Sequence, residues 1–180
     1  MSGLLACVAA VGLFLRPGFA SASQADIFGR PVPHADGRPT VVVFTNRSTQ
    51  ESVQNPLPDL LAQQTRSLPL VIVHVDLRGV PGFVHGFAYD RLRKRWGRGL
   101  DRYRQQVRAS GREPAKDPEN SLYFVADADG APEKAVGLPK DFMTPLVIAS
   151  DAQGRELVRV PFPQGAASLD AALTGAIGSR

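Results

Sequence analysis

Residues 144–158 read TPLVIASDAQGRELV, and this stretch decides the fold. Its first part, PLVIAS at 145–150, is apolar and rich in branched side chains, which favours a buried strand. Residues 151–154 (DAQG) have the composition and length of a hairpin turn, and residues 156–160 then predict a returning strand. The stretch therefore predicts an antiparallel strand pair near the end of the chain.

Three further apolar runs precede this hairpin, and none of them alternates with polar residues. They are TVVVF at 40–44, LPLVIVHVD at 68–76 and LYFVA at 122–126, each typical of a strand buried on both faces. Segments of helical composition separate and follow the strands. We expect a first helix from about residue 49, which Pro56 and Pro58 should delay or kink. A second should cover residues 80–109, with breaks at glycines 82, 86, 97 and 99. A single helical turn is expected over 135–138, and a closing helix over 166–177.

This order of elements predicts an α/β domain with a mixed central sheet and helices on both faces. Its 180 residues and 43% hydrophobic content suit one folded domain with a leader, and the formal net charge is +4. Residues 26–39 are rich in Pro and Gly and predict an N-terminal loop, with room for a short hairpin.

The first 25 residues have the pattern of a signal peptide. The apolar run over 4–15 is too short to span a bilayer, and small-x-small patterns at 20–22 and 23–25 offer two cleavage sites. We therefore expect export to the periplasm or the medium, with residues 26–180 as the mature domain. A buried N-terminal helix is the alternative interpretation.

Cys7 is the only cysteine of the chain, and it lies in this leader. The residues LLAC at 4–7 are similar to a lipobox, but the apolar run continues beyond the cysteine, so lipidation is the less favoured alternative. After cleavage the chain has no thiol and can form no disulfide.

Three stretches together resemble the redoxin branch of the thioredoxin-like superfamily. Residues 41–52 resemble the strand that leads into the active-site helix, and residues 127–137 resemble the Asp-x-x-Gly stretch before the proline loop. Residues 144–158 resemble the Thr-cisPro, strand and hairpin that close the fold. The resemblance covers about residues 27–178, extends to periplasmic YtfJ-type proteins that lack the cysteine pair, and implies a thioredoxin-like fold.

The sequence departs from this superfamily at its reactive residues. Aligned on Phe44, the two positions of the Cys-x-x-Cys pair fall on Thr49 and Ser52. A hydroxyl group has no accessible anionic form near neutral pH and cannot form a mixed disulfide, so we expect neither oxidoreductase nor peroxidase activity. A hydroxyl nucleophile would need a nearby base, and the sequence suggests none; the plainer interpretation is that Ser48 or Thr49 caps the helix.

The resemblance implies that Pro145 is cis and that Thr144 presents its backbone to an extended peptide. We therefore predict a non-catalytic module that binds a protein or peptide, although the proline could also serve the fold alone. The predicted binding face comprises Thr45, Thr49, Ser52, Met143, Thr144 and Pro145.

Ten basic residues and only two acidic ones lie between positions 91 and 116. On a helix, steps of four, three and four place one set on a common face. This basic stripe comprises Arg91, Arg95, Arg98 and Arg102. It predicts an alternative function, an envelope-associated protein on an anionic surface, whereas the plainer interpretation is a solvated face with Trp96 and Tyr103 packed inward. Nucleic acid is not an expected partner of an exported chain.

The histidines supply at most half of a metal site. His74 and Asp76 lie two residues apart on a predicted strand and share a face, but nothing brings His34 or His85 to them. We therefore predict no metal and no cofactor. An enzyme with non-thiol chemistry is a third alternative, for which the sequence offers no set of residues.

Overall fold

The computed structural model describes residues 24–33, 36–64 and 67–178. Most of the predicted leader, including Cys7, lies outside the described residues, as does His34. Within the described ranges, no helix has the length and the apolar character needed to cross a membrane.

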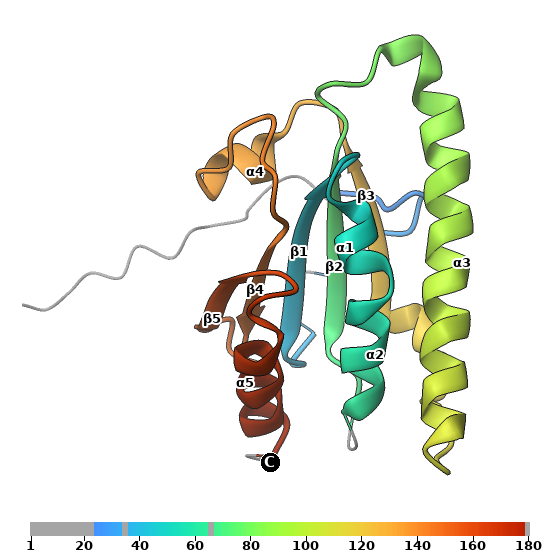
Figure 1. Cartoon of the computed structure of the whole chain (residues 1–180), viewed down its shortest axis with the longest axis vertical. Coiled ribbons are helices and arrows are strands. Elements are labelled where there is room, and N and C mark those ends of the chain that lie inside the picture. The colour runs from blue at the N-terminus through green and yellow to red at the C-terminus, as the bar shows by residue number, and fades with distance from the viewer. Residues whose placement is uncertain (1–23, 34–35, 65–66, 179–180) are drawn as a thin grey trace, which may run out of the picture.

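A five-stranded mixed sheet forms the centre of the molecule, in the order β3-β2-β1-β4-β5 (Figure 1). The strands are β1 (Thr40–Asn46), β2 (Leu70–Asp76), β3 (Leu122–Asp127), β4 (Leu146–Ser150) and β5 (Glu156–Pro161). The first three are parallel to one another, β4 is antiparallel to β1, and β5 is antiparallel to β4. The predicted strands and the terminal hairpin are thus confirmed.

The helices differ from prediction in two places. They are α1 (Gln50–Gln54), α2 (Pro56–Gln63), α3 (His85–Ala109), α4 (Ala131–Ala135) and α5 (Ala166–Gly178), with short 3-10 helices η1 (Gly82–Val84) and η2 (Pro118–Ser121). The predicted interruption before Pro56 is confirmed. The predicted breaks inside α3 are wrong, because the helix continues past its glycines. Packing of its buried face against the core stabilises it there, through Leu92, Leu100, Tyr103 and Val107. The turn expected over 135–138 instead begins directly after Gly130, whose left-handed backbone ends the preceding turn.

Most of the apolar core lies on one face of the sheet. Alternate strand residues, such as Val43, Val73 and Val147, point to this face and pack against α1, α2, α3 and α5. Figure 1 shows α1, α2 and α5 in front of the sheet and α3 along its side. The opposite face carries a smaller cluster, Val32, Leu70, Ile72, Tyr123 and Val125. Helices flank the mixed sheet as predicted, and the short α4 brings its buried Glu133 near Asp76 and Asp127 at the ends of β2 and β3.

The N-terminal loop closes the outer edge of β3. The N–H of Ile27 donates to the Phe124 carbonyl at 2.8 Å, and Ala25 pairs with Pro31 as a minimal hairpin. Arg30 then bonds the main chain beside β3, at the Glu119 and Leu122 carbonyls, both at 2.9 Å. Its guanidinium also lies over the rings of Phe28, Trp96 and Tyr123, at 4.6 to 5.5 Å.

Replacing Arg30 with Lys should therefore lower the free energy of unfolding by about 2 kcal/mol, because an ammonium group cannot reproduce a planar, multiply bonded and stacked guanidinium. Urea unfolding followed by the fluorescence of Trp96, the single tryptophan, measures this change. The matched control is Arg159→Lys, at a half-exposed pair with Glu156 on β5, where the change should stay within about 0.5 kcal/mol. Equal losses in both variants would contradict the prediction.

Candidate functional site

The loop between β1 and α1 is organised around Asn46. Its Oδ1 atom accepts bonds from the Ser48 N–H at 2.9 Å and the Thr49 N–H at 3.1 Å. Its Nδ2 atom donates to the Phe142 carbonyl at 2.8 Å. Because Phe142 immediately precedes the proline loop, this bond ties together the two segments that were predicted to form one face. Asn46 was not among the predicted site residues.

Thr49 and Ser52, at the positions aligned with the family's cysteines, have different environments. Thr49 is buried, and its Oγ1 lies 3.0 Å from the Thr45 Oγ1 and accepts from the Asn46 N–H at 3.0 Å. Ser52 is exposed on α1. Thr49 precedes the helix, but neither it nor Ser48 caps it through the side chain, because the Thr49 hydroxyl is turned back onto the end of β1. The hydroxyl of Thr49 thus bonds to amide and hydroxyl groups, which are not bases.

The proline loop presents an exposed edge. Met143 is 79% exposed and Thr144 is exposed, whereas Pro145 is buried. The N–H of Phe162 donates to the Pro145 carbonyl at 2.9 Å, which extends the pairing of β4 with β5 by one residue. Within the described part of the chain, neither the N–H nor the C=O of Thr144 has a hydrogen-bond partner.

The expectation of a cis bond before Pro145 is wrong. Among the described residues the one cis peptide bond is Phe162–Pro163. The chain bends at Met143 and Thr144, and Pro145 then continues the extended path of β4 into its ladder with β5. Thr144 nevertheless keeps the free backbone groups that the predicted binding mode requires.

A group of buried carboxylates lies beside these loops and was missed by the sequence analysis. Register places Asn46, Asp76 and Asp127 side by side at the carboxyl ends of the three parallel strands. Asp76 forms a two-pronged ion pair with Arg78, the shortest distance being 2.6 Å, and Arg78 also donates to the Pro139 carbonyl at 3.2 Å. The sequence does contain one indication of this group, because three apolar strands each end in a polar residue.

Glu133 of α4 adds a third acid to this carboxylate group. Its side chain is fully buried, and neither carboxylate oxygen has a hydrogen-bond partner among the described residues. Burial, with a smaller contribution from Asp127 and Asp76, raises the pKa of Glu133 to about 7, against the opposing charge of Arg78. Burial also raises the pKa of Asp127 to about 6, and the neighbouring carboxylate of Asp129 adds to this effect. Glu133 therefore keeps its proton at pH values well above those at which a glutamate usually ionises.

His74 is a buried side chain that stacks on Phe44, with ring centroids 5.3 Å apart and an interplanar angle of 13°. Burial lowers the pKa of His74 to about 4, so the ring is neutral near pH 7. Its Nδ1 has no hydrogen-bond partner among the described residues. His85 instead lies 3.0 Å from the Val80 carbonyl. In the described ranges, no three His, Cys, Asp or Glu side chains are placed to hold a metal ion.

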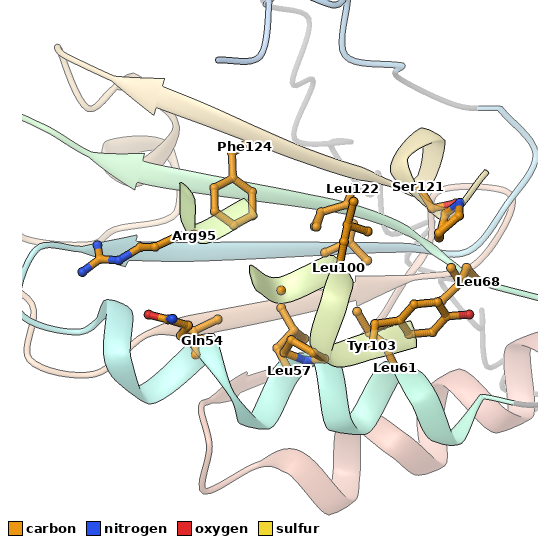
Figure 2. Close-up of a pocket in the computed structure, with 15 residues that line it drawn as sticks. Gln54, Leu57, Leu61, Leu68, Arg95, Leu100, Tyr103, Ser121, Leu122 and Phe124 are labelled. Carbon is orange, nitrogen blue, oxygen red and sulfur yellow. The ribbon is translucent and has the colours of Figure 1, made fainter. Parts of the chain in front are cut away.

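An apolar cavity of about 60 Å³ lies between α2, α3 and β3 (Figure 2). Its lining includes Leu57, Leu61, Leu100, Tyr103 and Phe124. Gln54 and Arg95 lie at one end, and the Arg95 guanidinium is directed away from the leucine side chains. The surface of this cavity is almost entirely apolar, which is typical of a packing defect in a hydrophobic core.

The four residues of the basic stripe have different surroundings. Arg102 forms a bidentate ion pair with Asp59 of α2 at 2.6 and 2.7 Å, so it serves packing of α3 on α2. Arg95 is half-buried, and burial lowers its pKa, with neighbouring Arg98 and Arg91 adding to this effect. Arg91 and Arg98 are exposed. The stripe therefore comprises two exposed cations, one half-buried arginine and one arginine held in an ion pair with α2.

No family model and no curated protein matches this chain. Its fold is similar to solved structures. One is BsSco, a member of the Sco family of cytochrome c oxidase assembly proteins, with a TM-score of 0.55 and 9% identity over 87% of this chain and 91% of that one. Another is the exposed lipoprotein thioredoxin Etrx1 of Streptococcus pneumoniae, with a TM-score of 0.52 and 13% identity over 84% of this chain and 96% of that one. A third is MTB dsbF, with a TM-score of 0.50 and 13% identity over 86% of this chain and 94% of that one.

Etrx1 is a thioredoxin, and the order and directions of the strands here agree with the resemblance seen in the sequence. At these levels of identity the similarity concerns the fold alone. The chain therefore has the thioredoxin-like fold and, with Cys7 as its only cysteine, lacks a Cys-x-x-Cys pair.

Proposed function

We propose that this chain is exported and that its mature domain binds an extended protein or peptide segment without thiol chemistry. The binding face is the one predicted above, built from the β1–α1 loop and residues 143–145. The observation that carries the proposal is the free backbone of Thr144, beside a Met143 side chain that is 79% exposed. An extended segment can pair with such an edge and place a side chain against the methionine.

Two features favour a functional binding face over a surface that only remains from the fold. The bond from Asn46 to the Phe142 carbonyl fixes the two loops relative to each other, so the face is preorganised. Thr49, whose hydroxyl is buried and bonded within the loop, stabilises the same turn. Export is supported by the signal-peptide pattern of the first 25 residues.

The composition of the chain provides a selective test. It contains two methionines, Met1 and Met143, so a mature chain grown with photo-methionine carries its cross-linker at Met143 alone. Irradiation in the envelope fraction should yield a cross-linked partner. Thr144→Arg should reduce that yield at least about tenfold, because a charged side chain would block the pairing edge.

The matched control is Thr174→Arg, which makes the same substitution on the exposed side of α5. This variant should give the wild-type yield. If Thr144→Arg and Thr174→Arg cross-link as well as the wild type, or if no partner is captured by the wild type, the proposed binding face is wrong.

A further inference from the structure

Two large aromatic side chains are strongly exposed where α3 begins. Phe83 of η1 is 87% exposed and Phe87 of the first turn of α3 is 74% exposed. They are four residues apart in the sequence, across the junction of η1 and α3, so two large apolar side chains are exposed within one short stretch of the chain. A soluble domain gains nothing from leaving two phenylalanines in water, so their grouping marks an interaction surface.

The same side of α3 continues as a row of cations. From Phe87, steps of four, three and four residues lead to Arg91, Lys94 and Arg98, all exposed. Leu92 and Tyr103 are buried on the opposite side of the helix, so this row faces outward. We define Phe83, Phe87, Arg91, Lys94 and Arg98 as the aromatic–basic face.

The charges of this face are uncompensated. Within the described part of the chain, none of its three cations has an ion-pair or hydrogen-bond partner. The nearby acids are engaged elsewhere: Asp90 pairs with Arg93 at 3.1 Å, and Asp101 lies 3.7 Å from Arg104. The surface is therefore positive and apolar at the same time.

We propose that the aromatic–basic face docks on an anionic lipid surface, with Phe83 and Phe87 in the interfacial region and the three cations among the headgroups. Aromatic side chains beside lysine and arginine are the composition of helices that lie in a membrane interface. Each cation near an anionic surface contributes about 1 kcal/mol, which changes binding about fivefold. A soluble polyanion could engage the cations but would leave the phenylalanines in water, so the aromatic pair favours lipid.

The test measures co-sedimentation of the mature chain with vesicles of phosphatidylglycerol and phosphatidylcholine, and with vesicles of phosphatidylcholine alone. The wild type should bind the anionic vesicles, and added salt should weaken this binding. The double variant Phe83→Ser with Phe87→Ser should lower the partition coefficient at least about tenfold. Arg91→Gln and Arg98→Gln should each lower it about fivefold.

Leu157→Ser is the matched control, because Leu157 is an exposed apolar side chain on β5, at the other edge of the sheet. It should bind vesicles as the wild type does. Soluble heparin supplies charge without an apolar phase, so the wild type and the double phenylalanine variant should bind it equally. Absence of wild-type binding to anionic vesicles, or equal vesicle binding by the phenylalanine variant, would overturn the proposal. It does not rest on the proposed peptide face, and Thr144→Arg should leave vesicle binding unchanged.

Discussion

Replacing Glu133 with Gln is expected to remove a loss of stability that the wild type undergoes as pH rises from about 4.5 to about 7. The Glu133 carboxyl is fully buried, so the folded protein keeps its proton up to about pH 7, whereas the unfolded chain loses it near 4.5. Over this window the unfolded state binds fewer protons than the folded state. The free energy of unfolding therefore falls as pH rises, by about 3 kcal/mol in total.

Glutamine has nearly the same shape and does not ionise, so the variant should be more stable than the wild type above about pH 7, by as much as this lost 3 kcal/mol. Urea unfolding at a series of pH values, followed by Trp96 fluorescence, measures the difference. A shallower slope of the same sign should remain at lower pH, because burial raises the pKa of Asp127 to about 6. Glu113→Gln, on an exposed loop, is the control and should leave the pH profile unchanged. A Glu133→Gln variant with the wild-type profile would contradict the assignment.

The central strands were predictable because each one has a strong local pattern. Val41 and Val43 belong to an apolar run that ends at polar residues, and such runs identify buried strands within a residue or two. The helix α3 was harder, because Gly97 and Gly99 lower its local propensity. Its continuity comes from tertiary packing of a buried side, which local propensity does not contain.

The candidate site was only half predictable for a similar reason. The motif around Thr144 and Pro145 pointed to the loop, and the structure ties that loop to Asn46. The carboxylate group depends on register and on a distant helix: Asp76 and Asp127 become neighbours through sheet pairing, and Glu133 joins them from α4. A sequence shows that these residues are acidic, but not that one cation, Arg78, lies among three buried acids.

Gly165 and Gly175 should respond to the same substitution with opposite signs. Gly165 lies between β5 and α5, and its N–H donates to the Pro161 carbonyl at 2.8 Å. A Cβ atom there would overlap the Val160 side chain and lie 2.9 Å from the Pro161 carbonyl oxygen. Gly165→Ala should therefore lower the free energy of unfolding by about 3 kcal/mol, since neither the Cβ of a valine nor a carbonyl can rotate away.

At Gly175, inside α5, an added Cβ would meet no atom within 4 Å. Gly175→Ala should raise the free energy of unfolding by about 0.5–1 kcal/mol, because alanine restricts the unfolded chain and favours the helix. Urea unfolding of both variants provides the comparison. Close approach at Gly165 lets α5 start directly behind β5 and bring Leu169 and Leu173, both fully buried, onto the sheet. If Gly165→Ala were as stable as the wild type, α5 would tolerate a shifted start, and its packing would not depend on this contact.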